Sequence, residues 1–106
     1  MTAAVRALAT MEELRKYVHE TLCEPDALEP AHSPLFQSLI KRSGRVCGLF
    51  FQVTGPRSVR LYAVWAGEED HILFYDSTGL RFAETRLSEA PDPARVVEEL
   101  PAKKAA

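Results

Sequence analysis

The chain has 106 residues, of which 46% are hydrophobic and 26% charged, and its formal net charge is -2 at pH 7. This length and composition are those of one globular domain with a hydrophobic core of its own. No apolar run approaches the roughly 20 residues of a membrane-spanning helix, and the slight negative charge argues against indiscriminate binding to nucleic acid or anionic lipid. Residues 1–10 are too weakly apolar for a secretory signal, so we expect a cytoplasmic protein.

A first helix is predicted to begin at Thr10. Residues 1–9 are rich in alanine without a recognisable pattern, so we expect them to be disordered. Thr10 and Glu13 form a capping-box sequence, in which each side chain can accept a hydrogen bond from the backbone N–H of the other residue. The apolar residues that follow have helical spacing: Met11, Leu14, Val18 and Leu22. Pro25 ends the helix, because proline disfavours helical geometry in the residue before it.

A second helix is predicted over residues 34–43. Ser33 and Pro34 have the character of an N-cap followed by proline at the first helical position, and Gly44 fits a left-handed residue at the end of a helix. The apolar side chains of this helix would be Leu35, Phe36, Leu39 and Ile40. Lys41 and Arg42 would complement the negative end of its dipole.

Residues 45–87 read as four strands of an antiparallel meander. The strands are rich in aromatic and β-branched residues, and their expected bounds are Val46–Thr54, Ser58–Ala66, His71–Asp76 and Leu80–Leu87. The segments between them contain glycine, proline and acidic residues, as turns do. Connections this short join antiparallel neighbours.

The turn lengths also predict a register. If Val53 pairs with Val59 and Ala66 pairs with His71, alternate residues of the strands gather on one side of the sheet. This side, the inner face, holds Cys47, Leu49, Phe51, Val53, Leu61, Ala63, Trp65, Ile72 and Phe74. A bulge at Gly79 would add Leu80 and Phe82. We expect the first two helices to cover the inner face.

The opposite side, the outer face, carries an aromatic row. The same register places Phe50 opposite Tyr62 and Tyr62 opposite Tyr75, with Val64 on one side of the row and Gln52 and Arg60 on the other. A sheet that faces water on this side would be polar here. Residues 41–66 also form a local basic zone, with five basic and no acidic residues.

The end of the chain completes the expected fold. Asp92 and Pro93 can begin a short third helix through Leu100, and residues 101–106 are expected to be a disordered tail. The prediction is therefore one two-layer α+β domain over residues 10–100. Its element order would be α-α-β-β-β-β-α, with a four-stranded antiparallel meander and helices packed mainly on one face.

No motif in the chain points to catalysis. His19 and Cys23 are four residues apart on the first helix, and His32 and Cys47 could complete a zinc site, but no typical metal-binding spacing is present. A thiol enzyme would need Cys23 or Cys47 activated by a histidine, and a small buried thiol is the more common role. We expect no catalytic residue, metal or cofactor.

Three explanations of the outer face are open at this stage. A helix of the same chain could cover it, another protein or a second copy could bind there, or single-stranded nucleic acid could stack on its rings. We expect a non-catalytic cytoplasmic protein-interaction module, either bound to a partner protein or homodimeric through the aromatic sheet face. Its interaction residues would be Phe50, Gln52, Arg60, Tyr62, Val64 and Tyr75. The alternatives are a single-stranded nucleic-acid binder that uses the same face, and a Cys/His-dependent enzyme or zinc protein.

Overall fold

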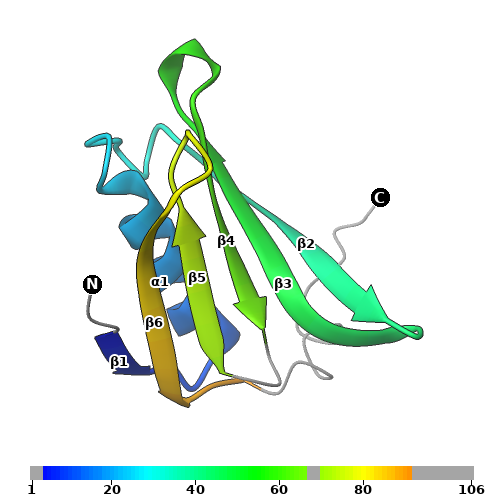
Figure 1. The fold of residues 1–106 in the computed structure, drawn as a ribbon. Coiled ribbons are helices and arrows are strands. Elements are labelled where there is room, and N and C mark those ends of the chain that lie inside the picture. Colours follow the sequence, from blue (N-terminus) through cyan, green and yellow to red (C-terminus); the bar gives the residue numbers. More distant parts are fainter. Residues whose placement is uncertain (1–3, 67–69, 92–106) are drawn as a thin grey trace.

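In the described part of the chain, one α-helix packs on one side of a six-stranded mixed sheet (Figure 1). The computed structural model describes residues 4–66 and 70–91. Its elements are β1 (Ala4–Ala7), α1 (Met11–Cys23), β2 (Leu35–Arg42), β3 (Arg45–Thr54), the 3-10 helix η1 (Pro56–Ser58), β4 (Arg60–Ala66), β5 (His71–Tyr75) and β6 (Arg81–Glu89). The strand order is β1-β6-β5-β4-β3-β2, in which β1 pairs parallel to β6 and all other neighbours are antiparallel. The described residues therefore form mainly sheet, with one α-helix.

The prediction for α1 is confirmed. The Glu13 backbone N–H donates to the Thr10 hydroxyl at 3.1 Å, and the Thr10 backbone N–H donates to the Glu13 carboxylate at 3.4 Å, which completes the capping box. The stripe that faces the sheet is buried: Met11, Leu14, Val18 and Leu22. The helix ends at Cys23, two residues before Pro25.

The predicted second helix is wrong, because residues 35–42 form β2. Its apolar residues occupy both faces of a strand: Leu35 and Leu39 point inward, whereas Phe36 and Ile40 point outward, and this distribution imitates a helical stripe. Ser43 and Gly44 both have positive φ, of 54° and 79°, as the central residues of a tight type I′ hairpin do. The glycine thus turns a hairpin and does not end a helix.

Residues 4–7 of the predicted disordered N-terminus form the strand β1, whereas residues 1–3 lie outside the described residues. This strand lies parallel to β6, and the Leu8 N–H continues the pairing by donating to the Glu89 carbonyl at 2.8 Å. Its partner strand is about 80 residues away in sequence, so no local sequence pattern could predict β1. The predicted third helix over residues 93–100 and the tail over 101–106 lie outside the described residues.

The four predicted strands form the centre of the larger sheet, with one change of register. Val53 lies opposite Leu61, two residues from the predicted partner Val59, because η1 lengthens the connection between β3 and β4. The predicted pairing of Ala66 with His71 is confirmed. A shift of two residues keeps every side chain on its face, since the pleat repeats every two residues.

The bulge near the last turn lies at Phe82 and not at Gly79. Asp76 closes the turn by accepting from the Leu80 N–H at 3.1 Å, so β6 starts its pairing with Arg81 opposite Tyr75. Phe82 is then the extra residue, half-buried against the ring of Phe74 at 6.1 Å between centroids. Leu80, which was predicted on the inner face, is 68% exposed.

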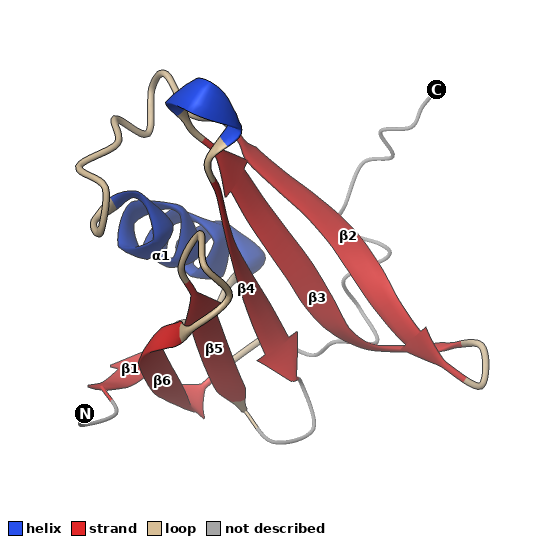
Figure 2. Cartoon of the chain, turned by 45° about the horizontal axis from the view of Figure 1, so that its top comes forward, coloured by secondary structure: helices blue, strands red, loops and turns tan. Residues whose placement is uncertain are grey.

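The core lies between α1 and the inner face (Figure 2). The largest fully buried side chains are Trp65, Phe51 and Phe74, and burial of each contributes about 2–3 kcal/mol to folding. Thr85 is the buried polar residue that ties the layers together, because its hydroxyl hydrogen-bonds the Tyr17 hydroxyl from α1 at 2.7 Å. α1 and the core thus occupy the inner side of the sheet, and no helix among the described residues lies on the outer face.

Candidate functional site

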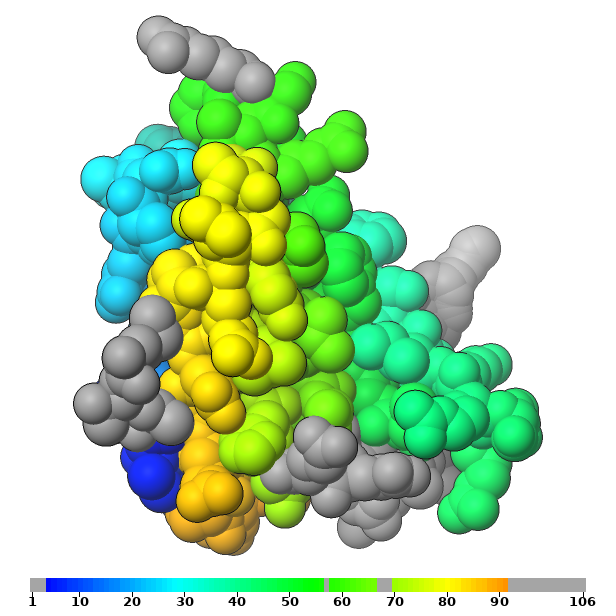
Figure 3. Space-filling view, in the orientation of Figure 1, coloured from blue at the N-terminus to red at the C-terminus, as the bar shows by residue number. Residues whose placement is uncertain are grey.

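The outer face is turned away from α1, and no helix among the described residues lies on it (Figure 3). Strand register assigns its residues, because directly paired residues share a face. Its uncharged members with side chains are Phe36, Ser38, Ile40, Phe50, Gln52, Thr54, Tyr62, Val64, Ala66, Leu73 and Tyr75. The apolar character of this surface is unusual for an uncovered sheet face.

The aromatic row exists, and two of its three rings stack on each other. Tyr62 lies opposite Tyr75, and their rings stack with centroids 5.0 Å apart and planes 15° apart. Phe50 lies opposite Val64, two residues along β4 from its predicted partner Tyr62. Its ring still reaches that of Tyr62, with centroids 5.8 Å apart. All three side chains are half-buried. The row therefore crosses β3, β4 and β5 as one unit.

The predicted neighbours of the row are present with altered partners. Gln52 lies directly opposite Tyr62, and Arg60 lies opposite Thr54 at the end of the strand pair. Val64 takes the place opposite Phe50. The structure thus brings all six predicted interaction residues onto one face.

The charged residues on the outer face are mostly arginines. Arg60 belongs to β4, whereas Arg81 and Arg86 of β6 lie opposite Tyr75 and His71. The acidic member on the described strands of this face is Glu84, whose carboxylate lies 3.6 Å from the His71 imidazole. The described acids other than Glu84 lie on α1, in loops and turns and at the end of β6: Glu12, Glu13, Glu20, Glu24, Asp26, Glu29, Asp70, Asp76 and Glu89. An acidic protein thus presents a basic face.

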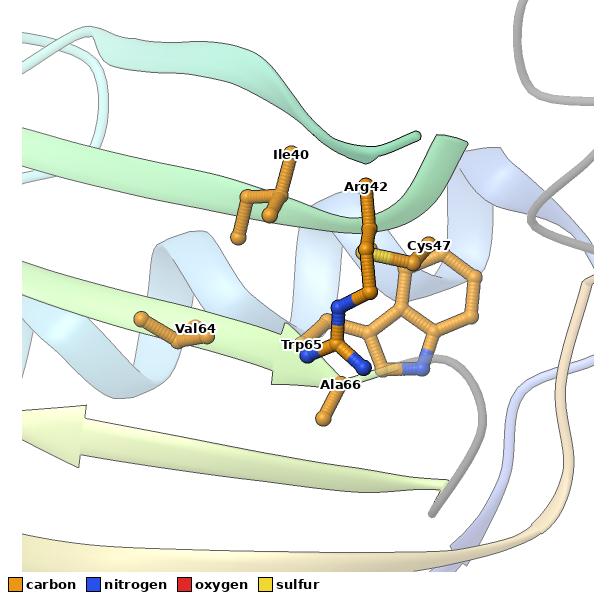
Figure 4. A pocket seen from close by; sticks show the side chains of 7 residues that line it. Ile40, Arg42, Cys47, Val64, Trp65 and Ala66 are labelled. Carbon is orange, nitrogen blue, oxygen red and sulfur yellow. The ribbon is translucent and has the colours of Figure 1, made fainter. Parts of the chain in front are cut away.

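A shallow hollow of about 220 Å³ adjoins the row at the β3 bulge (Figure 4). Ile40 pairs with Gly48 and Lys41 with Val46, so Cys47 is the extra residue of the bulge. The hollow is lined by Ile40, Arg42, Cys47, Gly48, Val64, Trp65 and Ala66. Gly48 is required there, because an added Cβ would lie 2.1 Å from the Trp65 carbonyl oxygen.

β2 supplies a part of the outer face that the sequence did not predict. Phe36, Ser38 and Ile40 were assigned to a helix, although they lie outward on β2 beside the aromatic row. Phe36 is 59% exposed. The tight Ser43-Gly44 turn before an alternating strand was the signal that could have placed them.

The structure gives no support to the predicted alternatives of a metal or thiol site. His19 Nε2 lies 2.7 Å from the Ser33 carbonyl oxygen, and the described residues contain no group of three or more His, Cys, Asp or Glu side chains placed to hold a metal. Cys23 is buried, and burial raises the pKa of its thiol, which opposes reactivity. Cys47 is half-exposed, and the lining of its hollow contains no histidine to act as a base.

Two further findings concern the whole described chain. None of its helices is long and apolar enough to span a membrane. Comparison with protein-family models, curated proteins and solved structures found no match, so the outer face is interpreted from its own geometry and chemistry.

Proposed function

We propose that this protein is a non-catalytic interaction module of the cytoplasm whose outer face binds an acidic segment of a partner protein. The observation that carries the proposal is the row of Phe50, Tyr62 and Tyr75, which lies on a face that bears arginines and that no helix among the described residues covers. Aromatic residues and arginine are enriched where proteins meet. A reducing compartment is in keeping with Cys23 and Cys47, which are both free thiols.

The chemistry of binding follows from the side chains present. Burying the half-exposed edges of the rings contributes about 25 cal/mol per Å² of apolar surface before the costs of association. The guanidinium groups of Arg60 and Arg81 can each bind a carboxylate through two parallel hydrogen bonds. An acidic segment with apolar side chains satisfies both requirements.

The charge distribution favours an acidic partner over a second copy on this face. A face-to-face homodimer would bring Arg60, Arg81 and Arg86 of both copies into one interface, where Glu84 is the acidic residue on the described strands of each outer face. Like charges brought together at a desolvated interface cost several kcal/mol. Self-association through the aromatic row is therefore the weaker form of the proposal.

Single-stranded nucleic acid is the second candidate, because the same arginines could meet phosphates. The ring geometry argues against it. Tyr62 and Tyr75 stack on each other with planes 15° apart, so each already occupies one face of its neighbour, whereas sheet-based RNA binders offer free ring faces to bases. Tyr62 and Tyr75 also carry hydroxyl groups, which can hydrogen-bond polar groups of a protein surface.

The experiment is an NMR titration of the full chain with short synthetic peptides. An acidic peptide that contains phenylalanine is compared with its sequence-matched lysine counterpart and with a single-stranded oligonucleotide. We expect the acidic peptide to shift resonances of outer-face residues, and we expect Tyr62→Ala and Arg60→Ala each to weaken its binding about tenfold, or about 1.4 kcal/mol. Arg15→Ala, on the exposed side of α1, is the matched control and should leave binding unchanged.

Two results would overturn the proposal. Equal binding of the acidic and lysine peptides would show that the arginines do not select the ligand. Tight, salt-sensitive binding of the oligonucleotide, weakened by Arg60→Ala, would instead establish the nucleic-acid candidate.

A further inference from the structure

The free edge of β2 is the least protected part of the described sheet. β2 is the last strand of the order β1-β6-β5-β4-β3-β2, so only its β3 side is paired within residues 4–66 and 70–91. It is eight residues long, whereas β1, the strand at the other edge, has four. Edge strands present unpaired backbone N–H and C=O groups that another strand can pair with.

The usual protection against such pairing is confined to the ends of β2. Pro34 precedes the strand, and Lys41 and Arg42 end it. The six residues between, Leu35–Ile40, carry no charge and no proline. The register with β3 is regular throughout this stretch and shifts only between Ile40 and Lys41. The central part of β2 is thus regularly paired with β3, uncharged, and free along its other edge within the described residues.

The sequence of β2 is complementary to itself in the antiparallel direction. With Ser38 opposite its counterpart, Phe36 of each copy lies opposite Ile40 of the other, so two apolar pairs form on the outer face. Leu35 then lies opposite Lys41, and the basic ends of the two strands point away from each other. The small serine at the two-fold axis leaves room for both phenylalanines.

We propose that β2 pairs antiparallel with β2 of a second copy, centred on Ser38, to form a continuous twelve-stranded sheet. A two-fold axis perpendicular to the sheet keeps both outer faces on the same side. Phe36, 59% exposed in the single chain, gains a cross-strand partner. The pairing does not rest on the proposed function, because it uses the backbone edge of β2 and leaves the aromatic row free.

Sedimentation analysis over a range of protein concentrations tests the pairing. The unmodified chain should show a reversible monomer–dimer equilibrium. Ser38→Lys should weaken the association at least tenfold, because it sets two like charges directly opposite each other while changing only an exposed side chain. Ser77→Lys makes the same change in the exposed β5–β6 turn and should leave the equilibrium unchanged.

A cysteine placed at the axis gives a second readout. Antiparallel partners have Cα atoms about 4.5–5.5 Å apart, a separation that a disulfide can span. In a Cys47→Ala background, Ser38→Cys should form a covalent dimer on mild oxidation, and Ser77→Cys should not.

Three outcomes would overturn the pairing. One is a monomer at every concentration, and another is equal dissociation by Ser38→Lys and Ser77→Lys. The third is a dimer abolished by Tyr62→Glu but not by Ser38→Lys, because this would place the contact on the outer face. Loss of peptide binding with an intact dimer would contradict the proposed function alone.

Discussion

The hydroxyl of Tyr17 on α1 lies 2.7 Å from the hydroxyl of Thr85 in β6, where Thr85 is 1% exposed. This hydrogen bond joins the helix to the sheet across the core. The Arg6 guanidinium of β1 covers the Tyr17 ring at 5.5 Å from its centroid, so one tyrosine connects three elements. The phenol therefore contributes to the assembly of both layers.

Tyr17→Phe should lower the free energy of unfolding by about 1–2 kcal/mol, because it leaves the buried Thr85 hydroxyl without its partner. Chemical denaturation measures the change. In a double-mutant cycle with Thr85→Val, the two losses should be less than additive. Strict additivity would show that the hydroxyls do not interact energetically.

Gly48→Ala should be among the most damaging single-methyl changes in the chain. The added Cβ would lie 2.1 Å from the Trp65 carbonyl oxygen, so β3 and β4 must move apart, and we expect a loss of about 2–3 kcal/mol in unfolding free energy. Gly44→Ala is the control, since an added Cβ there meets nothing within 4 Å. It should cost only about 1 kcal/mol through its positive φ of 79°. Equal losses would contradict the steric explanation.

The sequence predicted those parts of the fold whose determinants are local. The Thr10–Glu13 capping box located α1, and two-residue alternation assigned residues of β3, β4 and β5 to the correct faces even where the register slipped by two. The aromatic row was found for this reason. β1 was missed because its partner lies at the other end of the chain.

The predicted second helix is wrong for a different reason. β2 is apolar on both faces, because Leu35 and Leu39 complete the inner face while Phe36 and Ile40 extend the outer one. Such a strand has no alternation and resembles a short amphipathic helix. The free edge that β2 has in the described sheet could not be recognised without knowing the strand order, so the proposed β2–β2 pairing could not be predicted from the sequence.

Ala27→Gly should raise the free energy of unfolding by about 1 kcal/mol. Ala27 has a φ of 53° in the turn after α1, a left-handed conformation that costs a residue with a Cβ about 1–2 kcal/mol and glycine little. Ala31→Gly, in the same loop but without positive φ, is the control and should lower stability slightly, because glycine gains entropy in the unfolded chain. Thermal unfolding of the two variants measures both changes in stability. A loss on Ala27→Gly would contradict the argument.

The Asp76 turn should make stability depend on pH. The Asp76 carboxylate accepts hydrogen bonds from the Thr78 hydroxyl at 2.7 Å and from the Thr78 and Leu80 backbone N–H groups, and these bonds lower the pKa of Asp76. A carboxyl with a lowered pKa stabilises the folded state above its ordinary pKa, and this contribution is lost as pH falls through the folded value. Asp76→Ala should therefore lower the melting temperature at neutral pH, and its difference from the unmodified chain should shrink below about pH 4. A difference in melting temperature that does not change with pH would show that the ionised Asp76 carboxylate is not the source of the stabilisation.

The two cysteines should react at very different rates in the folded protein. Cys23, the last residue of α1, is 2% exposed, and burial raises the pKa of its thiol, so both access and thiolate formation are suppressed. Cys47 is half-exposed at the β3 bulge. With an alkylating reagent and mass spectrometry, Cys47 should be modified at least tenfold faster, and the difference should disappear in denaturant. Equal labelling in the native state would place Cys23 outside the core and contradict the packing of α1 on the sheet.

Burial of Cys23 should also make stability fall at alkaline pH. Because the raised pKa favours the protonated thiol in the folded state, Cys23 should destabilise the fold as pH rises above the ordinary pKa of a thiol. Cys23→Ala should remove this loss of stability.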